Sequence, residues 1–173
     1  MWSMKKILVP TDFSESSERA LEAAITLAKK FDASIVLMHA YQLPVYPYPA
    51  MTSASLPAGD LVEYVEHGAR AAIQTAASRH GDCGVPITTV LKAGTPWEQI
   101  LRTAKEISAG LIVIGSRGLR GLPRALLGST AERVVRYSSV PVMAFHGPLP
   151  VSEEDKAAEG VKAANDLVDR WLF

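Results

Sequence analysis

The chain has 173 residues, which is enough for one domain with a sizeable hydrophobic core. Eighteen basic residues balance eighteen acidic ones, so no net charge draws the protein to nucleic acid or to an anionic membrane. A single cysteine, Cys83, excludes an internal disulfide and a cysteine metal cluster. No apolar stretch reaches the ~18 residues of a membrane span, and the N-terminus lacks a signal-peptide pattern, so we expect a cytosolic protein without a membrane anchor.

The N-terminal part predicts a strand, a helix and a second strand. Residues 6–9 form a short apolar strand that ends at Pro10, and Ser14 is the predicted N-cap of the helix that follows. Residues 34–40 are apolar on both faces, which is typical of a strand covered by helices on both sides. Residues 41–59 are rich in proline, which prevents a regular element there. A variable surface connection, a lid over a ligand and a partner-binding loop all fit that segment.

The same alternation continues to residue 145. Helical periodicity places Phe31 on the buried face of the first helix and Val135 on that of the last. The remaining predicted elements are a helix at 61–80, a strand at 86–91, a helix from 95, a strand at 111–114, a helix from 129 and a strand at 140–145.

Two of these helix starts carry a capping signature. Thr95 is followed by Pro96 and Glu98, which gives a capping residue, a proline at the first helical position and an acid three residues after the cap. Ser129 is followed three residues later by Glu132, so we expect a capping box with the helix starting at or near Ser129.

Strands that alternate with helices imply a parallel sheet with right-handed crossovers. The predicted fold class is therefore α/β, a three-layer sandwich of a five-stranded parallel sheet with helices on both faces. Ligands of such sheets bind at the carboxyl ends of the strands, where the strand order reverses.

The stretch from 111 to 132 is the strongest indication of a binding site. A buried strand leads into Gly115 and Gly118, and Gly128 and Ser129 open the next helix. Glycine has no Cβ to keep a phosphate away from the backbone, and a helix N-terminus offers unpaired N–H groups and partial positive charge. We interpret this segment as a phosphate-binding loop.

The two common phosphate signatures do not describe this loop. A Walker loop requires a lysine before the Ser or Thr, and Gly128 stands before Ser129. The dinucleotide fingerprint requires glycines after the first strand, where Pro10, Thr11 and Asp12 stand.

The spacing Gly115-x2-Gly118-x9-Gly128-Ser129 instead resembles the ATP-binding motif of the universal stress protein family. The resemblance also covers the opening KILVPTDFSESSERAL, the segment GLIVIGSRGLRGLPRALLGSTAERVV and the closing SSVPVMAF. It implies strand order 3-2-1-4-5, which places the first and fourth strands side by side. It also implies a universal stress protein-like domain at 1–146. The tail lies outside the resemblance, and its own apolar periodicity predicts a C-terminal helical extension at 147–173.

The resemblance assigns an adenosine-binding role to Asp12, although aspartate also favours turns and helix caps at such positions. The backbone around His39 and Ala40 matches the region that contacts adenine, and we expect the His39 side chain to be structural. Arg117, Arg120 and Arg124 fit either phosphate contacts or solvated surface positions. The predicted nucleotide-binding residues are Pro10, Thr11, Asp12, His39, Ala40, Gly115, Ser116, Arg117, Gly118, Gly128, Ser129 and Thr130.

The predicted function is that of an ATP-binding universal stress protein, a dimeric nucleotide-dependent sensor or modulator that acts on an unknown downstream protein. Mg²⁺ would accompany ATP through the phosphates alone, because the histidines are scattered. The sequence shows no complete catalytic apparatus, so we expect slow ATP hydrolysis at most. A protein-interaction module of the same fold that binds no nucleotide is the alternative, and an ATP-dependent enzyme of a related family is a third.

The family resemblance also implies a homodimer through the strand at 140–145, which lies at the edge of the sheet in this order. Pro141 removes one backbone donor, so pairing has to start beyond it. The tail from Ser152 has an apolar helical stripe, which would pack either on its own domain or on a partner subunit.

Overall fold

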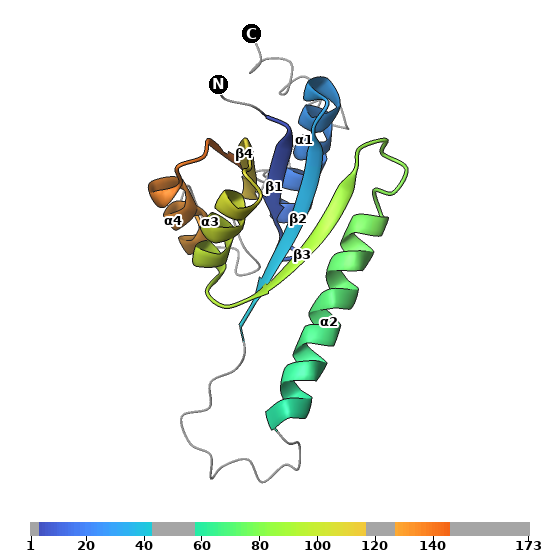
Figure 1. Cartoon of the computed structure of the whole chain (residues 1–173), viewed down its shortest axis with the longest axis vertical. Coiled ribbons are helices and arrows are strands. Elements are labelled where there is room, and N and C mark those ends of the chain that lie inside the picture. Colours follow the sequence, from blue (N-terminus) through green and yellow to red (C-terminus); the bar gives the residue numbers. More distant parts are fainter. Residues whose placement is uncertain (1–3, 43–57, 117–126, 146–173) are drawn as a thin grey trace, which may run out of the picture.

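A computed structural model describes residues 4–42, 58–116 and 127–145 and shows a central sheet with helices packed against it (Figure 1). Strands and helices alternate in the predicted order. They are β1 (Lys6–Pro10), α1 (Glu15–Phe31), β2 (Ser34–Tyr41), α2 (Ala58–Ser78), β3 (Ile87–Ala93), α3 (Pro96–Glu106), β4 (Leu111–Gly115), α4 (Ser129–Tyr137) and β5 (Val142–Phe145).

The five strands form one sheet in the order β3-β2-β1-β4-β5, which confirms the predicted order. Every neighbouring pair is parallel. Leu8 on β1 lies opposite Val36 on β2 and opposite Ile112 on β4, so β1 is paired along both of its sides. The strand order reverses between β1 and β4, which is where ligands of such sheets bind.

Two apolar layers fill the space on the two faces of the sheet. Ile7 and Ile35 pack with residues of α1 and α2 on one face. Leu8 and Val36, one position along each strand, pack with residues of α3 and α4 on the other. Alternate side chains of a strand point to opposite faces, so a strand covered on both sides is apolar throughout, as the sequence of β2 predicts. The predicted three-layer sandwich is confirmed.

The start of α1 forms as predicted, whereas the other two predicted caps differ in detail. Ser14 is the N-cap of α1, and its hydroxyl accepts a hydrogen bond from the Ser17 N–H. Thr95 is the N-cap of α3, but its side chain makes no capping hydrogen bond. The N-cap of α4 is Gly128 rather than Ser129, because the Gly128 carbonyl already accepts the first helical bond, from Glu132 N–H at 2.8 Å.

Several predicted boundaries and buried positions also shift. The third strand extends to Ala93 rather than 91, and the fifth begins at Val142 rather than 140. Phe31 is 42% exposed and Val135 is 48% exposed. Neither side chain lies in the core, so the prediction for these two residues is wrong. Phe31 is the last residue of α1, and on α4 the neighbouring Val134 takes the buried position instead of Val135.

The side chains that α2 is seen to bury in the core lie in its second half. In Figure 1 its first half extends beyond the ends of the strands. Ile73 and Ala76, in the second half, are buried in the core, whereas Val62 and Tyr64 in the first half are exposed. No helix in the described part of the chain is long and apolar enough to cross a membrane. The proline-rich segment from 43 to 57 and the tail from 146 lie outside the described residues.

Gly115 lies where β4 and the first turn of α1 meet at their closest. A Cβ added to Gly115 would lie 2.7 Å from Ser16 Oγ and 2.8 Å and 2.9 Å from the carbonyl carbon and oxygen of Ser16. Backbone atoms cannot rotate away from such a contact, so any side chain here has to push α1 from the sheet. Gly115 is thus required by close packing at the end of the strand.

We predict that Gly115→Ala lowers the free energy of unfolding by about 1–3 kcal/mol, the usual cost of overpacking. Urea denaturation followed by circular dichroism measures the change. Gly68→Ala is the matched control, because a Cβ at Gly68, inside α2, has nothing within 4 Å. It should raise stability by about 0.5–1 kcal/mol through helix propensity. Equal effects of the two substitutions would contradict the packing role of Gly115.

Candidate functional site

The turn after β1 and the segment after β4 meet at the carboxyl edge of the sheet, because these strands are neighbours. The first brings Thr11 and Asp12 to this edge, and the second brings Gly115 and Ser116. The start of α4 joins them, since the Gly128 N–H donates to the Ser116 carbonyl at 2.7 Å. The structure therefore brings the turn at Asp12 beside the segment after Gly115, as expected if the first and fourth strands are neighbours.

The Asp12 carboxylate stabilises the turn between β1 and α1. Its Oδ1 accepts hydrogen bonds from the Ser14 N–H, at 3.1 Å, and from the Ser14 hydroxyl. The turn-forming alternative for Asp12 is therefore observed. Phe13, the residue between them, has φ 63°, a left-handed conformation that costs a non-glycine residue about 1 kcal/mol. The two bonds to Asp12 help to hold the chain in that conformation.

Thr11 links the same turn to β2. Its N–H donates to the Met38 carbonyl at 2.8 Å, and its hydroxyl accepts from the Phe13 N–H at 3.0 Å. The Thr11 carbonyl lies 2.8 Å from Nδ1 of His39. A carbonyl only accepts, so this His39 nitrogen carries the proton and donates. Pro10 and Thr11 are buried and Asp12, His39 and Ala40 are half-buried.

His39 is a structural histidine, as expected, because this bond fixes its ring. The Phe13 ring lies against it, with 4.5 Å between the ring centroids, and remains 38% exposed. The sequence gives no indication of this role for Phe13. No local signal marks a phenylalanine for positive φ, since the conformation depends on the Asp12 and Thr11 bonds around it.

Ser116 is fully buried and held at both backbone groups. Its N–H donates to the Phe145 carbonyl of β5 at 2.7 Å, and its carbonyl accepts from Gly128. Its hydroxyl, in contrast, has no hydrogen-bond partner among the described residues. A buried hydroxyl without a partner is unusual and indicates a missing acceptor or donor, such as a ligand oxygen.

The N-terminus of α4 is the second feature that suits an anion. The first-turn N–H groups of a helix have no partner within the helix and carry partial positive charge. Here these groups belong to Ser129, Thr130 and Ala131, directly after the Gly128 cap. Gly128 has φ −61° and ψ 151°, a conformation open to any residue, so glycine matters here through its missing side chain rather than its backbone freedom.

Two of the predicted site residues, Arg117 and Gly118, lie outside the described residues, as do Arg120 and Arg124. The other ten are described, and all of them lie at the carboxyl ends of β1, β2 and β4 or at the start of α4. Ser16 was missed, although its backbone is the contact that requires Gly115. Within the described ranges, no group of three His, Cys, Asp or Glu side chains is placed to hold a metal ion.

Tyr41, at the end of β2, links this edge of the sheet to α2 through a hydrogen bond to Glu66. Desolvation raises the pKa of the Tyr41 phenol above 10.0, and the neighbouring Glu66 carboxylate raises this pKa further, while Arg70 opposes the shift. The phenol therefore stays protonated at neutral pH and donates to Glu66 Oε2 at 3.4 Å.

The sequence and the structure of the chain both match proteins of a known family. The model of the "Universal stress protein family" matches residues 4–146. Universal stress protein MJ0531 of Methanocaldococcus jannaschii is 35% identical over 145 residues, which is 83% of each chain. The solved structure of the hypothetical protein MJ0577 covers 84% of this chain and 97% of its own, with TM-score 0.70 and 27% identity. A universal stress protein solved in complex with cAMP has TM-score 0.58 and 28% identity, covering 83% of this chain and 98% of its own.

We predict that Ser116→Ala raises the free energy of unfolding of the ligand-free protein by about 1 kcal/mol, because it removes a buried hydroxyl that has no partner among the described residues. Thr103→Val is the matched control, since Thr103 is also buried with an unpaired hydroxyl but lies on α3. Urea denaturation after removal of nucleotides measures both. A clear loss of stability in Ser116→Ala would show that this hydroxyl already has a protein partner.

Proposed function

The chain belongs to the universal stress protein family, and we propose that it is an ATP-binding member, a dimeric sensor whose nucleotide state alters its contact with a partner protein in the stress response. The sequence spacing of the three glycines and the geometry at the carboxyl edge support the same ligand. A solved relative in complex with cAMP supports an adenine nucleotide as the class.

The observation that carries this proposal is that a buried hydroxyl with no partner among the described residues lies beside a helix N-terminus. The Ser116 hydroxyl and the first-turn N–H groups of α4 are tied together by the Gly128 to Ser116 hydrogen bond of 2.7 Å. Phosphate oxygens accept from both kinds of donor. We therefore assign the phosphates of ATP to Ser116, Gly128, Ser129 and Thr130.

The adenosine part of the nucleotide is assigned to the neighbouring turn and strand end. Asp12 lies beside the phosphate-binding segment because β1 and β4 are paired. A carboxylate accepts hydrogen bonds from ribose hydroxyls. Pro10, Thr11, His39 and Ala40 complete this part of the site, with the backbone of β2 facing the base. Mg²⁺ would enter with the nucleotide and be held by its phosphates.

The first test is the release of small molecules from purified, denatured protein, identified by mass spectrometry, together with ATP titration by calorimetry. Aspartate is a favoured N-cap residue, so Gly128→Asp should fold normally. Its carboxylate would repel the phosphates and should weaken ATP binding at least about tenfold.

Gly128→Asn is the matched control, because asparagine also caps helices but has no charge, and it should retain most of the affinity. Ser116→Ala should also weaken binding, whereas Thr103→Val should not. A wild-type protein that carries no nucleotide and does not bind ATP would overturn the proposal and favour an interaction module that binds no nucleotide.

The proposed dimer rests on the open edge of β5. The Pro141 carbonyl accepts a hydrogen bond from Ile112 of β4, and the Phe145 carbonyl accepts one from Ser116, directly after β4, so the backbone groups of the odd-numbered residues face β4. The backbone groups of Val142 and Ala144 therefore point to the open edge. Two such edges pair readily about a two-fold axis, and Pro141 leaves both of these outward donors in place.

We predict that Ala144→Pro converts the dimer into a monomer of 18.6 kDa, because it removes an outward N–H while leaving the bonds to β4 intact. Light scattering at micromolar concentration measures the mass. Ala144→Ser keeps the donor and should remain dimeric. A monomeric wild-type protein would contradict the dimer.

A further inference from the structure

The strand β3 forms the second open edge of the sheet. It pairs with β2 along seven residues, from Ile87 to Ala93, and no other described strand lies beside it. The Ile35 N–H donates to the Pro86 carbonyl, and the Gly94 N–H donates to the Tyr41 carbonyl. Even-numbered residues of β3 therefore bond to β2, and the backbone groups of the odd-numbered residues point outward.

Within the described part of the chain, the residues that carry these outward groups include neither a charged residue nor a proline. A lysine or a proline within an edge strand discourages pairing with another chain. The charged residue of β3, Lys92, is bound to Glu106 of α3 at 3.0 Å. The residues with outward backbone groups are uncharged: Ile87, Thr89, Leu91 and Ala93.

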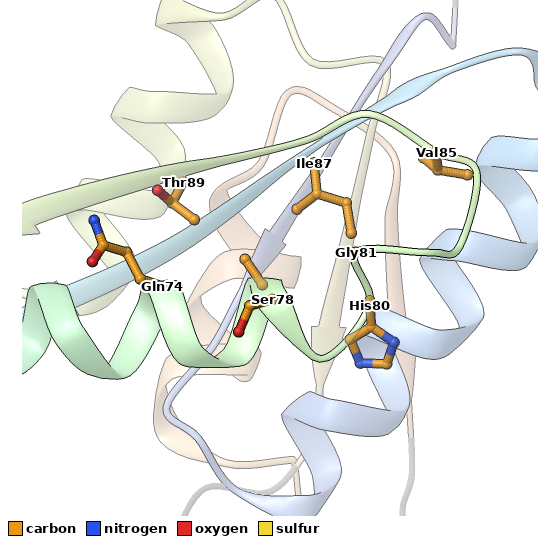
Figure 2. Close-up of a pocket in the computed structure, with 8 residues that line it drawn as sticks. Gln74, Ser78, His80, Gly81, Val85, Ile87 and Thr89 are labelled. Carbon is orange, nitrogen blue, oxygen red and sulfur yellow. The ribbon is translucent and has the colours of Figure 1, made fainter.

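A cavity of about 340 Å³ adjoins this edge on the face covered by α2 (Figure 2). Ile87 and Thr89 of β3 line the cavity with their side chains. The backbone groups of the same two residues point outward at the edge of the sheet. Gln74 and Thr89 lie at one end of the cavity in Figure 2, and His80 and Val85 lie toward the other. The volume is at the lower end of the roughly 300–1,000 Å³ of small-molecule sites.

The lining indicates an uncharged side chain as the occupant. Ala77, Val85 and Ile87 are apolar, and none of the described lining residues is Lys, Arg, Asp or Glu. The imidazole of His80 is already hydrogen-bonded to Glu18 Oε1 through Nε2, at 2.8 Å. A peptide carboxylate or ammonium group would find no counter-charge there.

We propose that the β3 edge and this cavity form a binding site for an extended peptide segment of another protein, which adds a strand to the sheet and places an aliphatic side chain in the cavity. Strand addition uses main-chain bonds for affinity and pockets for alternate side chains for specificity. The odd-numbered residues of β3 provide the main-chain groups, and two of them, Ile87 and Thr89, also line the cavity.

A second copy of the chain is a less suitable occupant. Copies that paired through both β5 and β3 would form an open-ended ribbon rather than a closed assembly. The peptide site does not depend on nucleotide binding, and it lies on the strand farthest from β5 in the sheet.

The test uses the full-length protein and a heptapeptide selected on it from a random phage-displayed library, synthesised with a fluorescein label. Thr89→Pro removes an outward N–H without breaking a bond to β2 and should weaken this peptide at least about tenfold by fluorescence anisotropy. Thr89→Val keeps the donor and should bind as wild type. Ser78→Phe, which fills the cavity from α2, should weaken the peptide without touching the strand.

Hydrogen exchange supplies an independent readout. The bound peptide should slow exchange of the amides at Ile87, Thr89 and Leu91, which face the edge. If Thr89→Pro does not fold, as judged by circular dichroism, Ser78→Phe and the exchange pattern still decide the question.

Four outcomes would overturn the peptide site. The selection could yield no peptide with Kd below about 100 µM, or the binding of the peptide could be unaffected by Ser78→Phe and by folded Thr89→Pro. Alternatively, the bound peptide could slow exchange only outside β3, or Thr89→Pro could convert a dimeric protein into a monomer. The last would identify β3 as a contact between copies. ATP titration of the same variants should match wild type, so failure of this site is distinct from failure of nucleotide binding.

Discussion

The backbone of Ser116 is the constraint on which the carboxyl edge of the sheet depends. Its two backbone groups bond at 2.7 Å to Phe145 at the end of β5 and to Gly128 at the start of α4. The neighbouring Gly115 lies against Ser16, whose hydroxyl reaches the same Phe145 carbonyl at 3.4 Å. Buried backbone groups have to be paired, so these four segments hold one another in place. The residues proposed to bind phosphate and the strand proposed to pair in a dimer therefore belong to one structural unit.

Much of the fold was predictable because the central elements obey simple periodicities. The strands β2 and β4 are each buried through four consecutive residues, as expected of strands covered on both faces. Ser14 caps α1 because a hydroxyl at that position satisfies an otherwise unpaired N–H. The strand order itself came from the family resemblance, since alternation alone does not fix which strands are neighbours.

The site was less predictable, because its details depend on contacts between distant segments. A capping box at Ser129 fits the sequence, but Gly128 is also an acceptable cap, and the local pattern does not decide which carbonyl begins the helix. The bonds from Ser14 to Asp12 could be anticipated as one alternative, whereas the positive φ of Phe13 could not. Likewise, burial of the Ser116 hydroxyl without a described partner follows from tertiary packing and has no signature in the sequence.

The two edges of the sheet differ in their described surroundings, and the partners proposed for them differ accordingly. The strand β5 is short, and the carbonyl of its last residue, Phe145, accepts a hydrogen bond from the Ser116 N–H. The position of β5 is therefore coupled to the proposed phosphate site. A symmetric contact between two β5 strands would therefore change when ligand binds in either subunit. The strand β3 is longer and bonds only to β2 among the described strands, and α2 leaves a cavity beside it. The cavity would bind side chains from only one face of an added strand. It therefore suits a partner of a particular sequence rather than a second copy of the same edge. A dimer through β5 would thus carry two peptide sites at its outer ends, far from the subunit contact.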